Sequence, residues 1–294
     1  MSSYAYGMTP AYAVLPMSCC HLNKESIFAF WQRRLFEKMI SVFKWRLPRG
    51  WNEDYFLWTL YTWGYIAGIY TNEYGLIPQQ CGLLGQGLYL QPDYIFVGTQ
   101  YVQIPNRRIG DRCVLFRLRA DYLGMMDIIN FYAMQLAEAY TALIVNLRNS
   151  KLPFVFTGSD KKEVETLKKL ADKIDSGEYA AFLKQGQGSW ETFNRNIKES
   201  YIAPELIQDI RKIMNAFNTE IGIPNTNVEK KERMVSDEVN SNNVETMLKM
   251  DEILDRLKGQ CNELNNIAGA DIISVDWRYK KDDLSQSPDT QGDV

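Results

Sequence analysis

The sequence predicts an α+β fold in which long helices are separated by β-rich segments. Apolar residues recur at every third or fourth position in three long stretches, which is the spacing of one helix face. Between them lie shorter runs rich in Val, Ile, Phe and Tyr that are bounded by Gly and Pro, as is typical of strands. The chain has 294 residues, of which 46% are hydrophobic, so it can bury a core of domain size.

The three long stretches predict helices at about 26–44, 122–149 and 204–221. The first has Ile27, Trp31, Leu35, Met39 and Val42 on one face. The second is so apolar that it must be covered on more than one side. A monomer of this size could do so, but a ring of subunits would do it more naturally. Pro204 can open the third helix because proline is tolerated at the first helical position, and "GIPN" at 222–225 ends it.

Shorter elements fill the rest of the chain. In order, we expect an aromatic helix at 53–70, a β-rich region at 75–120, a strand at 152–158, a charged helix at 159–176, a helix at 244–258 and a strand at 271–279. The ends of the chain are polar or irregular. We therefore expect a flexible arm at 1–25 and a disordered tail at 281–294.

The composition disfavours the common catalytic sites. The single histidine, His21, lies in the N-terminal arm, which argues against catalysis that needs a positioned imidazole and against a histidine-rich metal site. The glycines of "CGLLGQGLYL" and "KQGQGSW" lack the lysine and hydroxyl of a P-loop and are interpreted as turns. The five cysteines match no zinc or disulfide spacing and are interpreted as inert thiols. We predict no catalytic residue, no metal and no cofactor.

Two other function classes stay open at this stage. Residues 55–72 carry no charge and could anchor the chain to a membrane, although the stretch is short for a span. Asp251, Glu252 and Asp255 fall within one turn of a predicted helix and could form a carboxylate site for a metal-dependent enzyme. The net charge of −3 disfavours tight, static binding to nucleic acid.

One segment identifies a family. The stretch "NTNVEKKERMVSDEVNSN" (225–242) closely resembles a signature of the portal proteins of small short-tailed (picovirus-type podovirus) phages of Gram-positive bacteria. These proteins are also called upper collar or head–tail connector proteins. Weaker similarity extends over 35–70, 131–156 and the strand "DIISVDWRY", so that roughly residues 25–280 are covered.

The resemblance implies a portal-type subunit that assembles as a ring, with a three-helix stem, a β-rich (SH3-like) wing and a small α/β narrow end. The stem would comprise a helix at 26–50, a long helix at 122–150 and a channel-lining helix at 204–223. The wing would comprise 51–121 and 244–280, the narrow end 151–203, and a tunnel loop 224–243.

By the same resemblance, the ring would be a dodecamer at one capsid vertex, the head–tail junction of the virion, made in the host cytoplasm. Its partners would be double-stranded viral DNA during packaging and ejection, the major capsid and scaffolding proteins, the packaging ATPase and the lower collar or tail protein. No basic residue precedes Lys24, so contact with a packaging RNA through the arm is not expected. The tunnel-loop residues that would face DNA are Glu229, Lys230, Lys231, Glu232, Arg233, Met234 and Val235. Lys198 would match a channel lysine.

Overall fold

The structure is a computed structural model. It describes residues 24–98, 103–151, 154–157, 161–162, 164–165, 168–169, 191–194, 201–223 and 236–278. The chain divides into two compact units, each taken by itself below. Unit 1 holds the described residues within Arg33–Phe131 and Asn215–Val294, and unit 2 holds those within Ala11–Gln32 and Tyr132–Met214.

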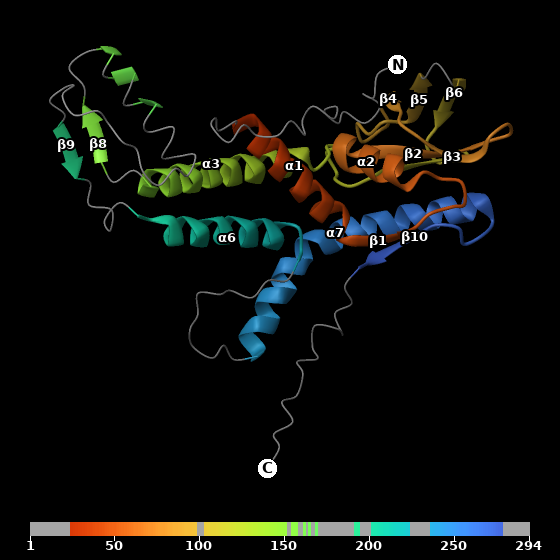
Figure 1. Ribbon diagram of the computed structural model, residues 1–294. Helices are drawn as coiled ribbons and strands as arrows, with labels where there is room; N and C mark the ends of the chain where they lie inside the picture. Colours follow the sequence, from red (N-terminus) through yellow and green to blue (C-terminus); the bar gives the residue numbers. More distant parts are fainter. Residues whose placement is uncertain are drawn as a thin grey trace. The chain divides into compact units, whose positions relative to one another are not determined.

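Helices and antiparallel sheets are both present, which confirms the predicted α+β class (Figure 1). The helices include α1 (Lys24–Ile40), α2 (Glu53–Trp63), α3 (Met126–Lys151), α6 (Ala203–Glu220) and α7 (Ser236–Ala268). The strands include β1 (Phe43–Arg46), β2 (Tyr65–Thr71), β3 (Gly75–Gln79), β4 (Gly82–Leu84), β5 (Tyr94–Gly98), β6 (Gln103–Arg108), β7 (Cys113–Arg117), β8 (Phe154–Thr157), β9 (Glu191–Asn194) and β10 (Ser274–Trp277).

Two three-stranded sheets of unit 1 share one core. Their strand orders are β3-β2-β7 and β4-β5-β6. The inward side chains of both sheets form a single buried cluster, which comprises Ala67, Ile69, Cys81, Ile95, Val97, Ile104, Cys113 and Leu115. The predicted β-rich region is therefore a pair of small sheets packed together. The finer SH3-like assignment remains a prediction.

The opposite face of sheet β3-β2-β7 is also buried. Helix α7 packs against β7, and α2 packs against β2. A cluster of aromatic rings fills the space, with Phe56 and Phe116 centroids 5.7 Å apart and Trp51 5.3 Å from Phe56. A Cβ atom on Gly68 would lie 3.1 Å from the Phe116 ring and 3.3 Å from Leu264, so only glycine fits without displacing these side chains.

Strand β10 closes unit 1 by pairing with β1 from the far end of the sequence. The register runs from Phe43 opposite Trp277 to Arg46 opposite Ser274. The turn from α7 into β10 is held by Asn265, whose side-chain oxygen accepts from Ile273 N at 3.1 Å and whose amide donates to Ile273 O at 2.9 Å. The predicted closing strand is thus present, and the structure shows its partner.

The predicted aromatic helix at 53–70 is wrong in its second half. Helix α2 begins at Glu53, where Asn52 caps it by accepting from Tyr55 N at 2.8 Å. It ends at Gly64, which adopts a left-handed conformation with φ 92°. The remaining residues form β2, which is buried on both faces of its sheet. Such a strand has a continuous apolar run without alternation, which the sequence pattern does not distinguish from a helix.

Four helix ends also differ from the predictions by four residues or more, and one of them is the end of α7, which lies at Ala268 instead of 258. Helix α1 ends at Ile40, because the chain then enters β1 instead of continuing to residue 44. Helix α3 begins at Met126, because Tyr122 is in a left-handed conformation with φ 62°. Helix α7 begins at Ser236, so residues 236–243, predicted to belong to the tunnel loop, are helical. Small polar residues favour caps and turns only weakly, and the long helix that follows overrides them.

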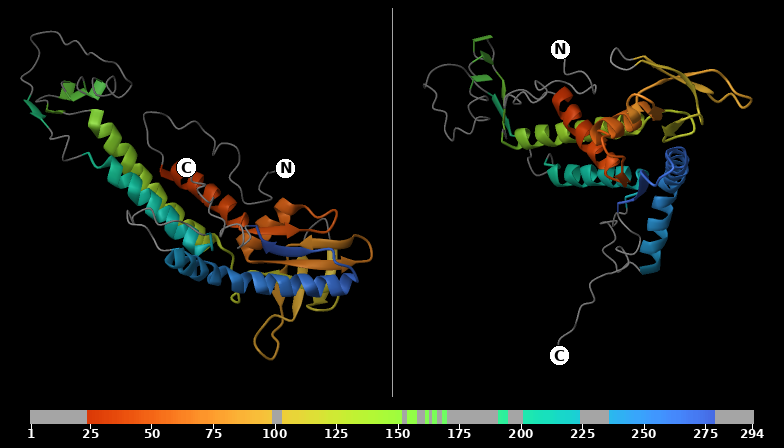
Figure 2. Two further views of the ribbon diagram at one scale, coloured as in Figure 1. Left: turned by 90° about the horizontal axis from the view of Figure 1, so that it is seen from below. Right: turned by 90° about the vertical axis from the view of Figure 1, so that its right-hand side faces the viewer.

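In unit 2, the 132–151 part of α3 runs alongside the 203–214 part of α6 (Figures 1 and 2). The first turns of α1 meet α3 through an ion pair between Lys24 and Glu138, at 3.2 Å, and through an edge contact between Trp31 and Tyr140, with centroids 6.1 Å apart. The predicted strand at 152–158 is present as β8, which pairs with β9. Of the predicted charged helix at 159–176, only short pieces are described.

Two glycines, Gly64 and Gly124, allow the backbone before α3 to approach the backbone at the end of α2 closely. Met125 N donates to Tyr61 O at 2.8 Å, and Leu118 N donates to Gly64 O at 3.0 Å. A Cβ atom on Gly64 would collide with the carbonyl group of Leu123, and one on Gly124 would collide with the carbonyl oxygens of helix α2. These are backbone atoms, which cannot move aside to make room as the end of a flexible side chain can.

We therefore expect Gly124→Ala to destabilise the protein by about 2 kcal/mol or more, as overpacking against backbone does. Gly259→Ala is the matched control, because Gly259 lies inside α7 and a Cβ there meets nothing within 4 Å. The control should be neutral or stabilising by about 0.5–1 kcal/mol. Urea unfolding followed by tryptophan fluorescence measures both variants. Equal urea midpoints for the two variants would contradict the close backbone contact at Gly124.

Candidate functional site

Helix α6 has one apolar side and one polar side. Ala203, Phe217 and Ile221 at its ends are buried. The exposed side carries mostly polar residues, with two larger apolar ones among them: Pro204, Glu205, Ile207, Gln208, Asp209, Arg211, Lys212, Ala216 and Thr219. Glu205 and Asp209 offset Arg211 and Lys212, and Lys212 Nζ lies 3.8 Å from Asp209 Oδ1. A face with such balanced charge exerts little net attraction on a polyanion such as DNA.

Helix α6 ends in a Schellman motif. Gly222 is in a left-handed conformation with φ 74°. Ile223 N donates to Asn218 O at 2.8 Å, and Gly222 N donates to Thr219 O at 3.3 Å, which satisfies carbonyl groups that the helix end would otherwise leave unpaired. The helix therefore stops sharply, and the chain leaves it in a defined direction.

The residues after α6 are packed against Met250 of α7 and against Trp277 of β10. A Cβ atom on Gly222 would lie 2.9 Å from Met250 and 3.1 Å from the Trp277 ring. Trp277 Nε1 donates to Asp251 Oδ1 at 2.9 Å, and its ring lies 5.2 Å from that of Phe43. We call Gly222, Met250, Asp251 and Trp277 the loop anchor, because they hold the chain on either side of residues 224–235.

A pocket of about 380 Å³ lies beside the loop anchor in unit 1. Its apolar lining is rich in methionine, and the apolar side chains are Met39, Met125, Ile128, Ile221, Met250 and Ile253. Its polar lining includes Arg119 and Arg256. Met39, Met125 and Met250 are 0%, 2% and 3% exposed, so these side chains belong mainly to the core beneath the pocket.

Both arginines of the pocket are paired within the subunit. Arg119 forms ion pairs with Asp127 at 3.0 Å and with Asp121 at 3.5 Å. Arg256 donates to the carbonyl oxygen of Leu118 and to the Glu252 carboxylate, each at 2.6 Å. Their charge is therefore compensated. The lining also carries the acidic side chains of Asp121, Glu220 and Glu252, so the pocket is not an anion site.

The residues predicted to face DNA, Glu229 to Val235, lie outside the described residues, as do Lys198 and His21. The structure describes instead what flanks the predicted loop. The sequence reasoning located the end of α6 through "GIPN" but missed the roles of Met250, Asp251 and Trp277. No local signal could have found these, because they meet Gly222 from distant segments.

The carboxylates once considered for a metal-dependent enzyme have other contacts. Asp251 accepts a hydrogen bond from Trp277, and Glu252 pairs with Arg256. Nearby, Lys258 Nζ lies 3.1 Å from the Asp276 carboxylate. Over the described ranges, no group of three His, Cys, Asp or Glu side chains is arranged to hold a metal ion. The structure gives these acidic residues stabilising roles in unit 1.

Three cysteines are buried as free thiols, Cys81, Cys113 and Cys261. Burial raises the pKa of each thiol to about 12. A thiol with so high a pKa is protonated at neutral pH and is a poor nucleophile. The structure therefore agrees with the interpretation of these three as inert.

A membrane anchor at 55–72 is not favoured, because this stretch is divided between the short helix α2 and strand β2 of the core. Among the described residues, one helical stretch, Met126–Ser150, has the length and hydropathy of a membrane span, with a mean hydropathy of 1.3 and 33% of its most apolar window buried. Core helices of soluble proteins pass the same test, so this is weak support for a span.

Comparison with known proteins identifies one family model, described as Phage Connector (GP10), which matches residues 17–281. Two solved structures are similar over most of the chain. One, described as the portal and tail of native bacteriophage P68, is 15% identical, with a TM-score of 0.47 and 89% of each chain covered. The other, an HK97 family phage portal protein from Corynebacterium diphtheriae, is 8% identical, with a TM-score of 0.47 and 92% of this chain and 95% of that chain covered.

The loop anchor generates a prediction about stability. Asp251→Ala leaves the Trp277 indole N–H without its partner, and we expect a loss of about 1–2 kcal/mol in the free energy of unfolding. Asp251→Asn keeps a side-chain oxygen that can accept the same hydrogen bond and should lose clearly less. Urea unfolding of the two variants measures the difference. An equal loss in both would mean that the carboxylate charge, and not the hydrogen bond, stabilises the anchor.

Proposed function

The chain belongs to the phage connector family, and we propose that it acts as a homododecameric ring whose axial channel conducts double-stranded DNA. The family match spans residues 17–281 and thus most of the chain. The protein is accordingly a bacteriophage portal, or head–tail connector, a structural component of the virion that associates with itself and with the head and tail. The ring number, the DNA contacts and the individual partners are the proposal.

The observation that best supports a ring is the second apolar face of α3. One face of the helix, including Ile129, Ala133 and Leu136, is fully buried within the subunit. On another face, Phe131, Met134 and Val145 are 55%, 59% and 45% exposed and lie at helical spacing with the exposed Ala142. The one charged residue in this row is Glu138, which pairs with Lys24 of α1. A helix that is apolar on two sides is normally covered on both. An adjacent subunit in a ring would cover the second face, because head-to-tail contacts repeated around an axis close into a ring.

The loop 224–235 is the proposed point of contact with DNA. It follows the charge-balanced face of α6 and is bounded by the Schellman motif at Gly222 and by the start of α7. Lys230, Lys231 and Arg233 alternate with Glu229 and Glu232, so the segment is only weakly basic. Repeated around a ring, a purely basic loop would bind phosphates tightly, whereas a mixed one can touch DNA without arresting it. Lys198 is proposed to face the channel, and Met234 and Val235 to belong to the same loop.

The remaining assignments follow the family resemblance. Residues 51–121 and 244–280 would form the wing, and 151–203 the narrow end, which would meet the packaging ATPase and later the lower collar or tail protein. The ring would nucleate assembly with the major capsid and scaffolding proteins of a short-tailed phage. It would be made in the host cytoplasm and, as a structural component, would itself catalyse no reaction.

The ring can be tested through the exposed face of α3. Met134→Glu would bury an unpaired charge between subunits, which costs several kcal/mol at each interface. At micromolar concentration we expect native mass spectrometry to show one ring of about twelve subunits for the parent chain and monomers or small oligomers for the variant. Circular dichroism should be unchanged, since Met134 is exposed within the subunit.

Gln208→Glu is the control, because it adds the same charge to the exposed face of α6, which is proposed to line the channel. This variant should still form rings. A parent chain that stays monomeric at micromolar concentration would overturn the proposal of a ring. A Met134→Glu variant that assembles normally would show that this face of α3 is not part of the subunit interface.

The DNA role of the loop has its own test. Deleting residues 229–235, which stops short of α7, should leave the ring intact and reduce the fraction of DNA-filled heads in infected cells supplied with the variant. A second variant replaces the same residues by Gly and Ser at equal length and so separates the loss of charge from the loss of length. Normal filling with both variants would exclude a role for the loop, and failure of the ring to form would make the loop structural.

A further inference from the structure

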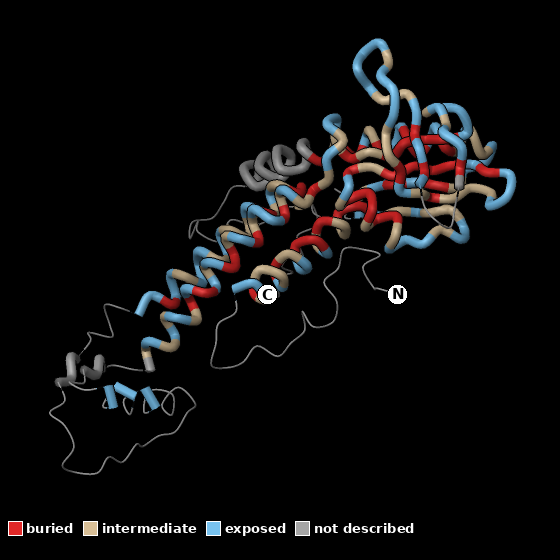
Figure 3. Tube along the Cα trace, turned by 90° about the horizontal axis from the view of Figure 1, so that it is seen from above, coloured by how far each residue is buried: buried red, intermediate tan, exposed pale blue. Residues whose placement is uncertain are grey.

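The start of α1 lies at the middle of the second apolar face of α3. Within unit 2 this face comprises Met134, Ala142 and Val145, which lie within about 40° of Glu138 around the helix axis, because each residue of an α-helix turns by about 100°. Exposed positions recur in this way along the two parallel helices of unit 2 (Figure 3). Lys24 Nζ lies 3.2 Å from both carboxylate oxygens of Glu138. The first residue of α1 is therefore bonded to the centre of the face.

Helix α1 crosses α3 from the side of this face. Its Trp31 contacts Tyr140, with ring centroids 6.1 Å apart. Tyr140 comes two residues after Glu138 and so lies roughly on the opposite side of α3, about 200° away. Lys24 is thus on the side of the second apolar face and Trp31 on the other side. The residues that precede Lys24 in the chain join α1 on the side of the second apolar face.

The segment that joins α1 at this point is uncharged and apolar. We call residues 1–23 the apolar arm, because 14 of the 23 are hydrophobic and none is Asp, Glu, Lys or Arg, whereas 23% of the whole chain is charged. Segments that stay solvated are typically rich in charge and poor in large apolar side chains. The arm has the opposite composition, so its side chains gain free energy when they leave water.

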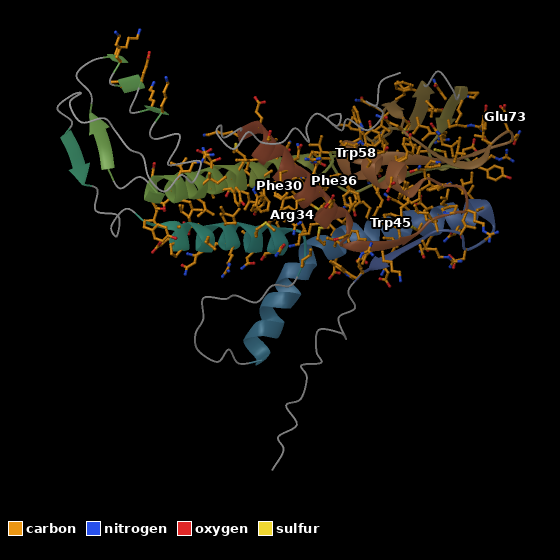
Figure 4. All side chains as sticks on the ribbon, in the orientation of Figure 1. Phe30, Arg34, Phe36, Trp45, Trp58 and Glu73 are labelled. Carbon is orange, nitrogen blue, oxygen red and sulfur yellow. The ribbon has the colours of Figure 1, made fainter. Side chains whose placement is uncertain are left out.

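The arm and the face match in chemistry and in length. The one carboxylate in the row, Glu138, is already paired with Lys24, so a segment without charge can lie on the face without burying an unpaired charge. From Met134 to Val145 the face is about 17 Å long at 1.5 Å per residue. Five or six extended residues cover such a distance, so the part of the arm next to Lys24 is sufficient. Phe30 of α1, labelled in Figure 4, is 51% exposed and adds an apolar side chain in the same unit.

We propose that the apolar arm packs on the second apolar face of α3 in its own subunit. Side chains of an extended segment point alternately to opposite sides, so about half of those in the arm would face away from α3 and need a further cover. In the proposed ring the adjacent subunit supplies that cover, and the arm is a layer between α3 and the neighbour. The contact between arm and α3 lies within one chain, and only its role in the interface rests on the proposed function.

Photocrosslinking of the full chain tests this contact. The photoreactive residue benzoylphenylalanine replaces Val145, and the protein is assembled from a mixture of ¹⁴N- and ¹⁵N-labelled chains. Because no Lys or Arg precedes Lys24, trypsin releases the arm as the single peptide 1–24. We expect mass spectrometry to find this peptide crosslinked to residue 145 only within chains of one label. The same replacement at Tyr74, which is 48% exposed in the turn between β2 and β3, is the control and should not capture peptide 1–24.

Two arm variants measure what the contact contributes to assembly. Deleting residues 2–22 should raise the concentration at which rings dissociate by roughly tenfold or more, because the face of α3 loses part of its cover. A second variant should have a similar effect, because it keeps the length of the arm and replaces four of its apolar side chains by Ser: Val14, Leu15, Met17 and Leu22. Deleting the polar residues 282–294 is the matched control and should change that concentration by less than about twofold.

The outcomes separate this inference from the proposed function. Rings in which residue 145 captures peptide 1–24 of the other label, or captures only other peptides, would overturn the contact within the subunit and leave the ring standing. A chain that stays monomeric but crosslinks residue 145 to its own arm would overturn the ring and keep the arm contact. Unchanged assembly of both arm variants would show that the arm is not part of the subunit interface.

Discussion

Burial of sheet β3-β2-β7 on both faces is the constraint on which unit 1 depends. One face meets sheet β4-β5-β6 through a cluster of aliphatic side chains and thiols. The other meets α2, α7 and a set of aromatic rings, at a distance so short that a Cβ atom at Gly68 would force neighbouring side chains to shift. A sheet with no solvent-facing side has nearly every side chain committed to packing. The contact with β7 positions helix α7, the longest described helix.

The same packing determines where the predicted tunnel loop begins and ends. Helix α7 packs on β7 and leads through Asn265 into β10, which pairs with β1. Strand β10 carries Trp277, and Trp277 together with Met250 leaves room only for a glycine at position 222. The end of α6 is thus anchored to the core of unit 1. Any force on the loop would be transmitted to a rigid base, which suits the proposed contact with moving DNA.

The exposed apolar surfaces indicate which parts of the subunit are left uncovered when it is isolated. The second face of α3 and the turn between β4 and β5 both expose large apolar side chains. Membership of an oligomeric family explains such surfaces without a membrane. Because they lie on separate elements, the role of each surface can be tested separately.

Much of the helical framework could be predicted from the sequence, because helix periodicity is a local property. Helix α6 was expected at 204–221 and runs from Ala203 to Glu220, with its stop signalled by the glycine of "GIPN". The start of α2 was likewise predicted at residue 53, where the structure has it. The family and the α+β class were also accessible, the former through one characteristic segment.

What only the tertiary structure decided depends on residues far apart in the chain. Strand β2 was mistaken for helix because burial on both faces removes the alternation by which a strand is recognised. The loop anchor could not be predicted, since Gly222, Met250 and Trp277 meet only after β10 has paired with β1. The sequence by itself determined the helices, the turns and the family, all of which depend on neighbouring residues. The structure decided which faces are covered, because burial is a property of the folded chain and not of any segment in it.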